Sequence, residues 1–154
     1  MNRFKVNIND LQESIKVPTG TRMLVRRCCK AVLHEENKEI FENVNIVFAE
    51  NRMLSELSGN NLAQESREIF VRLPDGEESE SGEQLGEVYI SLESAMERSK
   101  TYNNSFEAEV VFLTAHALFL LLGYKNPDAL EKDDLLYKEK RIINLLGIKY
   151  NNPA

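Results

Sequence analysis

Residues 105–123 read SFEAEVVFLTAHALFLLLG, and this stretch decides how the rest of the chain is interpreted. Ser105 is a typical helix N-cap residue, Glu109 stands near the position that completes a capping box, and Gly123 suits the residue that follows a helix end. The apolar run Val110–Leu122 is shorter than the roughly 20 residues that a membrane span needs. The stretch therefore predicts a buried helix at the centre of a folded domain, and we expect no membrane partner.

Strand and helix patterns surround this central helix. Phe4, Val6 and Ile8 alternate with polar residues, which is the period of a strand. Because helical segments separate the first strands, we expect those strands to pair in parallel. We interpret the loop at 75–84, which has five acidic residues and no basic one, as the tip of a hairpin between the last two strands. The predicted strands are Phe4–Ile8, Val44–Ala49, Ile69–Leu73 and Leu85–Ser91, and the predicted helices are Thr21–Glu35, Glu50–Leu57, Leu92–Lys100, Phe106–Leu122 and Leu130–Leu146.

These elements predict an α/β (α+β) fold, in which about five helices pack against one small mixed four-stranded sheet. The 154 residues suit a single domain, which we place at residues 1–149, followed by a flexible tail at 150–154. The N-terminus lacks the long apolar segment of a secretory signal, and the adjacent Cys28 and Cys29 fit a reducing compartment. We therefore expect a cytoplasmic protein.

The charge of the chain is unevenly distributed. The whole chain has 19 basic and 25 acidic residues, a formal net charge of −6, which is unlike a strongly basic nucleic-acid-binding protein. Residues 1–35, however, hold seven basic residues and three acidic ones. Four of the basic residues share one side of the predicted helix at 21–35, which is either a solvated surface or a stripe that contacts phosphate. They are Arg22, Arg26, Arg27 and Lys30.

Histidine and cysteine are scarce in this chain. The two histidines are His34 and His116, and the two cysteines are the adjacent Cys28 and Cys29. Neighbouring cysteines cannot join distant segments, so a disulfide framework is excluded, and a site of three histidines cannot be built. A cysteine nucleophile paired with His34 is not favoured, because that histidine lies off the helix face that carries Cys28.

Residues 116–126, HALFLLLGYKN, resemble the signature H-G-x-L-H-L-x-G-Y-D-H of the YbeY family of ribosomal RNA maturation factors. In that signature two histidines four residues apart share a helix face, and a third follows the glycine turn. Together they make a three-ligand zinc site with one position open for water. His116 occupies the first position, and the Gly-Tyr turn is kept. Leu120 stands at the second histidine, Asn126 at the third, and Lys125 replaces the aspartate.

Further segments resemble the family in the right order. Residues 85–91, LGEVYIS, are similar to its L-G-D-I-x-I-S strand, with Glu87 in place of the aspartate. Residues 68–74 align with its T-D-V-L-S-F-P strand. In the family an N-x-x-Y-R segment precedes that strand, and its arginine is proposed to act in the family's cleft. An alignment without gaps places Leu62 at the position of this arginine. The resemblance covers residues 44–147, about two thirds of the chain.

The resemblance implies a factor in ribosomal RNA processing or ribosome assembly, with its metal-dependent hydrolase activity weakened or lost. Zinc is the family's cofactor, and we expect it to be absent or weakly held here. His116 is then a vestigial ligand, or simply a hydrogen-bonded, partly buried histidine. We expect the partners to be ribosomal RNA or ribosomal proteins and not DNA. The predicted RNA-binding residues are Arg22, Arg26, Arg27 and Lys30.

Two alternatives stay open. The chain could be an active single-strand endoribonuclease in which Asp128, Asp133, Asp134 or the two cysteines replace the lost ligands, although none of them has the spacing of those ligands. It could also be a non-enzymatic protein-interaction module, in which the acidic loop at 75–84 contacts a basic partner. The sequence predicts no oligomeric state.

Overall fold

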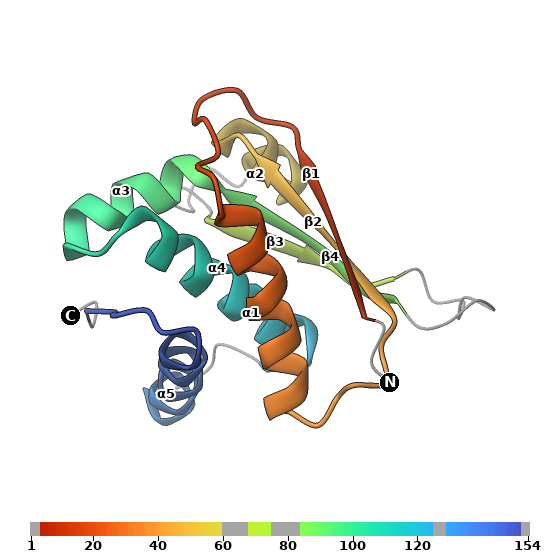
Figure 1. Cartoon of the computed structure of the whole chain (residues 1–154). Coiled ribbons are helices and arrows are strands. Elements are labelled where there is room, and N and C mark those ends of the chain that lie inside the picture. The colour runs from red at the N-terminus through yellow and green to blue at the C-terminus, as the bar shows by residue number, and fades with distance from the viewer. Residues whose placement is uncertain (1–3, 60–67, 75–83, 125–128, 152–154) are drawn as a thin grey trace.

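The structure is a computed structural model that describes residues 4–59, 68–74, 84–124 and 129–151. These ranges contain four strands and five helices in the order that the sequence predicts (Figure 1). The prediction of an α/β (α+β) domain with one small mixed sheet is therefore confirmed. The strands are β1 (Lys5–Asp10), β2 (Asn43–Ala49), β3 (Ile69–Arg72) and β4 (Gln84–Ser91), and the helices are α1 (Thr21–Glu35), α2 (Asn51–Leu57), α3 (Leu92–Tyr102), α4 (Phe106–Leu121) and α5 (Ala129–Leu145).

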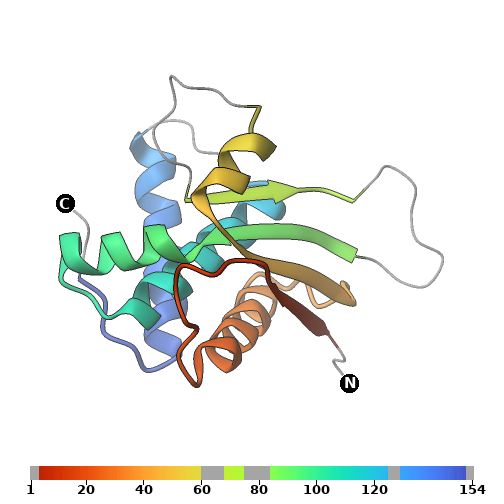
Figure 2. The same ribbon diagram turned by 90° about the horizontal axis from the view of Figure 1, so that it is seen from above.

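The four strands form one sheet in the order β1-β2-β4-β3, so β1 and β3 lie at opposite edges (Figure 2). β1 pairs with β2 and β2 with β4 in parallel, whereas β3 and β4 form an antiparallel pair. Parallel pairing of strands separated by a helix is thus confirmed for β1 and β2, but it is wrong for β2 and β3, which are not neighbours. In the inner position of β4, Val88 and Ile90 are fully buried, whereas no residue of the edge strand β3 is.

Helix α4 is the centre of the domain and contacts α1, α3, α5 and the β3-β4 hairpin. α5 packs on α4 and α1 and lies away from the sheet (Figure 1). The Ser105 hydroxyl accepts a hydrogen bond from the backbone N–H of Ala108, as its predicted N-cap role requires. From Ala108 to Leu121 every residue is buried except His116 and Leu120. The predicted central helix is therefore confirmed, and beyond its first two residues it is accessible only at two positions four residues apart.

A sharp break separates α3 from α4. Asn103 ends α3 in the left-handed conformation, with φ at 57°. In the described ranges no single helix is long and apolar enough to cross a membrane. The pair α3 and α4 together reaches that length and composition, but the two helices are bent by 118° at the break.

Gly86 lies at an irregularity of β4. The pairing with β2 shifts between Asn43 and Asn45, so that β4 holds one extra residue there. Gly86 has a φ of 148°, and a Cβ atom on it would lie 2.7 Å from the carbonyl oxygen of Arg72 and 2.8 Å from Cδ2 of Leu121. Glycine is required at this position because any side chain would collide with β3 and α4.

The C-terminal segment is fixed to the domain at Tyr150 and Asn151, where we predicted the start of a flexible tail. The Tyr150 hydroxyl donates a hydrogen bond of 2.9 Å to Oε1 of Glu109, and its ring stacks on Phe112 with centroids 5.1 Å apart. The backbone N–H of Asn151 donates to a side chain in the break between α3 and α4 at 2.7 Å. The sequence does not indicate this attachment because the hydrogen-bond partners lie 41 and 47 positions away. Residues 152–154 lie outside the described residues.

Candidate functional site

His116 and Leu120 form the accessible strip of α4. They are four residues apart and therefore lie on the same face of the helix, one turn from each other. These are the positions at which the signature has its first and second histidines. The fold keeps that face accessible, but the Leu120 side chain has no lone pair to give to a metal ion. Asn126, at the third position, lies outside the described residues.

The imidazole of His116 is held by a buried carboxylate of α5. Its Nδ1 atom lies 2.5 Å from Oε2 of Glu139, and the exposed fraction of the side chain is 25% for His116 and 3% for Glu139. Phe112, one turn earlier on α4, stacks on the imidazole with ring centroids 6.1 Å apart. Since Nδ1 is bonded to the carboxylate, Nε2 is the ring nitrogen left for another partner. Metal-ligating histidines are commonly oriented in this way.

The remaining donors do not complete a zinc site. In the part of the chain that the structure describes, no three His, Cys, Asp or Glu side chains are arranged to hold a metal ion. Of the replacement ligands considered above, Asp134 is exposed on α5. The side chains of Asp128 and Asp133 are not among those that the structure describes. The signature positions offer one imidazole, one alkyl group and one neutral amide, and zinc prefers thiolate, imidazole or carboxylate. These residues do not fit a zinc ion.

Cys28 and Cys29 belong to the core. Both are fully buried and unpaired, and the Cys28 thiol donates to the carbonyl oxygen of Val111 at 3.6 Å. Burial raises the pKa of both thiols, so they stay protonated near neutral pH and are poor nucleophiles and metal ligands. His34 is 71% exposed on the other side of α1, with Nδ1 3.4 Å from Glu39. The structure therefore does not pair either cysteine with His34, in agreement with the sequence, which does not favour such a nucleophile.

The four basic residues predicted to bind RNA are all exposed on α1. Arg22 lies 3.8 Å from the carboxylate of Asp10, which is the outer limit of an ion pair. Among the described residues, no acidic side chain forms an ion pair with Arg26, Arg27 or Lys30. These three positive charges are therefore available to an anionic partner.

Glu87, at the family's aspartate position in β4, pairs across the hairpin with Arg72. The Arg72 Nη1 atom lies 3.2 Å from Oε1 of Glu87, and the Tyr89 hydroxyl donates to the same oxygen at 3.4 Å. The guanidinium also lies 5.8 Å from the ring centroid of Tyr89. Partial burial, followed by the charge of Glu87, raises the pKa of Tyr89. Glu87 thus stabilises the hairpin at this position.

A buried polar network, which sequence reasoning missed, joins α3, α4 and the C-terminal segment. The Glu109 carboxylate is fully buried and accepts hydrogen bonds from Arg98 Nε at 2.8 Å, from the Tyr150 hydroxyl at 2.9 Å and from Asn104 Nδ2 at 2.7 Å. Burial by itself lowers the pKa of Arg98, but the hydrogen bonds to Glu109 and Tyr150 outweigh it and raise that pKa. Glu109 is therefore the buried partner of an arginine and not part of a capping box.

Glu139 was also missed, although the sequence has a signal for it. Leu135, Ile142 and Ile143 are buried and mark the inward face of α5. Position 139 lies four residues after the first of them and three before the second, so it belongs to the same face. A carboxylate on the inward face of an amphipathic helix needs a buried partner, and His116 is that partner.

Comparisons with known proteins place the chain in a family. The family described as Endoribonuclease YbeY matches residues 7–147. The endoribonuclease YbeY of Desulforamulus reducens is 30% identical over 149 residues, covering 93% of this chain and 97% of that protein. The corresponding protein of Clostridioides difficile is 30% identical over 146 residues, covering 92% and 95%.

A solved structure supports the same fold. The solution structure of TM1509 from Thermotoga maritima is similar with a TM-score of 0.56, covering 93% of this chain and 90% of that one. At 18% identity, this is a likeness of fold alone. The family match over residues 7–147 and the two 30% identical relatives confirm the resemblance seen in the sequence, and the chain belongs to the YbeY family.

Proposed function

We propose that this chain is an RNA-binding factor of ribosomal RNA maturation or ribosome assembly, with metal-dependent hydrolase activity weakened or lost. The observation that carries the proposal is the accessible strip of α4. His116 is still oriented by a buried carboxylate, but its neighbour on the strip is Leu120. The family fold is kept around a face that lacks the donors for its chemistry.

A zinc ion held by three protein ligands would supply a bound water of lowered pKa as the nucleophile for RNA hydrolysis. One imidazole does not hold zinc in this way, and neither Leu120 nor Asn126 adds a donor that zinc prefers. No cleavage step follows from these residues.

RNA binding is the part of the family's function that the described surface supports. Arg26, Arg27 and Lys30 present unpaired positive charge on α1 of an acidic chain. Each phosphate contact releases counterions, so an affinity carried by the four basic residues of α1 should fall with salt with a logarithmic slope of about −3. Ribosomal RNA and ribosomal proteins are the proposed partners, and the cytoplasm is the proposed compartment because the two free, adjacent cysteines suit reducing conditions.

The test is a titration of a fluorescein-labelled ribosomal RNA hairpin, followed by fluorescence anisotropy at low and high salt. We expect the double variant Arg26→Glu, Arg27→Glu to bind at least about tenfold more weakly at low salt and to show a shallower salt slope. The matched control is Lys100→Glu with Lys149→Glu, which makes the same change of charge at exposed positions away from α1. Absent binding by the wild type, or equal affinity of the two double variants, would contradict the proposal.

Zinc content separates this proposal from the alternative of an active endoribonuclease. Protein purified without a metal-affinity tag should contain well under one zinc ion per chain by elemental analysis. We also expect no EDTA-sensitive cleavage of the RNA hairpin by this protein. Stoichiometric zinc together with EDTA-sensitive cleavage would establish the alternative instead.

A further inference from the structure

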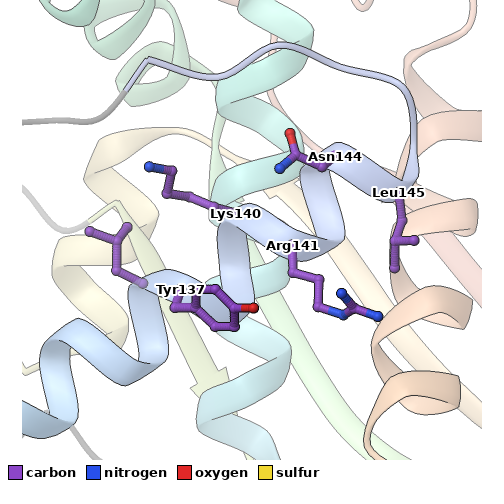
Figure 3. A pocket seen from close by; sticks show the side chains of 6 residues that line it. Tyr137, Lys140, Arg141, Asn144 and Leu145 are labelled. Atoms are coloured by element: carbon purple, nitrogen blue, oxygen red, sulfur yellow. The ribbon is translucent and has the colours of Figure 1, made fainter.

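The outward face of α5 carries a second surface with the chemistry of a ligand site. A cavity of about 550 Å³, within the range of small-molecule sites, opens on this face (Figure 3). It is separate from the His116 strip, because Glu139, which holds His116, is on the buried side of α5. The cavity is lined by Leu136, Tyr137, Lys140, Arg141, Asn144 and Leu145.

Helical spacing organises these side chains into two neighbouring rows. Tyr137, Arg141 and Leu145 follow one another at intervals of four residues, and the second row lies one residue earlier on the helix. Tyr137 is 67% exposed and Leu145 is 51% exposed, so neither contributes much to the core. An aromatic ring and an aliphatic side chain are thus presented to solvent between polar groups.

Two of the described lining residues, Lys140 and Arg141, are cationic. None of the described residues that line the cavity is acidic, and in the described ranges Lys140 forms no ion pair. Arg141 donates through Nε to Glu35 of α1 at 2.8 Å, which orients the guanidinium and leaves its terminal nitrogens for another acceptor. Figure 3 shows Arg141 and Lys140 leaving α5 on opposite sides, with Tyr137 one turn before Arg141.

A smaller neighbouring cavity, of about 270 Å³, differs from the larger one in the charges of its lining residues. It shares Tyr137 and Arg141 with the larger cavity, and its other charged lining residues among those described are Glu35, Glu36, Asp134 and Lys138. Glu35 pairs with Arg141 and Glu36 with Lys138. In the described ranges the carboxylate without an ion pair in this lining is Asp134, whereas Lys140 is the cation without one in the larger cavity, so a phosphate is favoured on the side of Lys140.

We propose that this α5 surface binds a nucleotide of single-stranded RNA. The base stacks on the ring of Tyr137, and the flanking phosphates contact Lys140 and the terminal nitrogens of Arg141. Exposed aromatic rings next to cations bind single strands because every base has a face that can stack, whereas the bases of a duplex are already stacked. The inference rests on the proposed RNA-binding function and adds a contact surface beyond α1.

Tryptophan fluorescence tests this directly, because the chain has no tryptophan. Tyr137→Trp places the only indole at the proposed stacking position, and Ile40→Trp places one at a similarly exposed site, 66% exposed in the wild type, outside α5. We expect a single-stranded RNA of about ten nucleotides to quench the first variant strongly and the second hardly at all. Equal quenching in both variants would overturn the inference.

Affinity provides the second readout, measured with the same labelled oligonucleotide. Tyr137→Ala should bind about tenfold more weakly, whereas Tyr137→Phe, which keeps the ring, should bind like the wild type. Lys140→Gln should weaken binding more than Lys100→Gln, which removes an exposed charge on α3. If Tyr137→Ala lost as much affinity for an RNA duplex of the same length as for the single strand, base stacking on Tyr137 would be contradicted. Wild-type affinity in Tyr137→Ala would overturn this inference and leave the proposed function standing, whereas a wild type that binds no RNA would remove both.

Discussion

The Nδ1 atom of His116 lies 2.5 Å from Oε2 of Glu139, and this contact joins the two helices that flank the candidate site. The carboxylate is buried on α5, and the imidazole is a quarter exposed on α4. A buried carboxylate that orients the imidazole is the usual support of a metal-ligating histidine. The histidine at the first position of the signature therefore has such a partner, and the chain differs from the signature at the two other histidine positions, Leu120 and Asn126.

Restoring those positions should restore metal binding. In the variant Leu120→His, Asn126→His, three imidazoles stand where the family signature has them, and we expect about one zinc ion per chain by elemental analysis. The control adds His116→Ala to the same variant and should lose the zinc. A folded double variant without zinc, with a wild-type circular dichroism spectrum, would show that more than the ligands has been lost.

The contact between His116 and Glu139 should contribute to stability. Glu139→Ala leaves Nδ1 without its partner in a partly buried place, and we expect the free energy of unfolding to fall by about 2 kcal/mol. Glu139→Gln keeps an acceptor and should cost less. Urea unfolding measures both, with Glu97→Ala, at an exposed position of α3, as the control. A Glu139→Ala variant as stable as this control would show that the pair is not stabilising.

The attachment of the C-terminal segment predicts a sharp boundary for shortening the chain. Removal of residues 150–154 deletes the Tyr150 ring from its stack on Phe112 and one donor to Glu109, so we expect a loss of about 2 kcal/mol. Removal of residues 152–154 keeps both contacts and should change stability little. Thermal unfolding compares the two chains, and equal melting temperatures would contradict the anchoring role.

Arg98 should be the most sensitive residue of the buried network. Its removal in Arg98→Ala leaves the fully buried Glu109 carboxylate without a cation, and we expect a loss of about 3–5 kcal/mol. The double variant Arg98→Met, Glu109→Leu removes both charges and should recover much of that stability. Urea unfolding decides this, and a double variant less stable than Arg98→Ala would contradict the explanation.

The two thiols should be unreactive in the folded protein. Burial raises the pKa of Cys28 and Cys29 above the ordinary thiol value, so near neutral pH the thiolate that reacts is almost absent. Labelling with a disulfide reagent should be slow in buffer and rapid in denaturant, with two thiols counted only after unfolding. Fast labelling of the native chain would show that a cysteine is accessible.

Local patterns in the sequence predict the individual elements of this fold well. The alternation at Phe4, Val6 and Ile8 predicts β1, and the apolar run after Ser105 predicts α4. Both patterns depend only on residues close together in the sequence, and both elements lie where they were expected. The place of β3 at the edge of the sheet did not follow from these patterns. It depends on how much apolar surface β3 and β4 each bury, which is a property of the packed sheet.

The sequence by itself determined which donors exist: one histidine at the signature, with Leu120 and Asn126 at the other ligand positions. Only the tertiary structure decided what the charged residues inside the domain do. Glu139 meets His116 across 23 positions, and Glu109 meets Tyr150 across 41. A buried charge requires a partner, but which distant residue supplies it depends on how the helices pack, and this is not encoded in any local period of the chain.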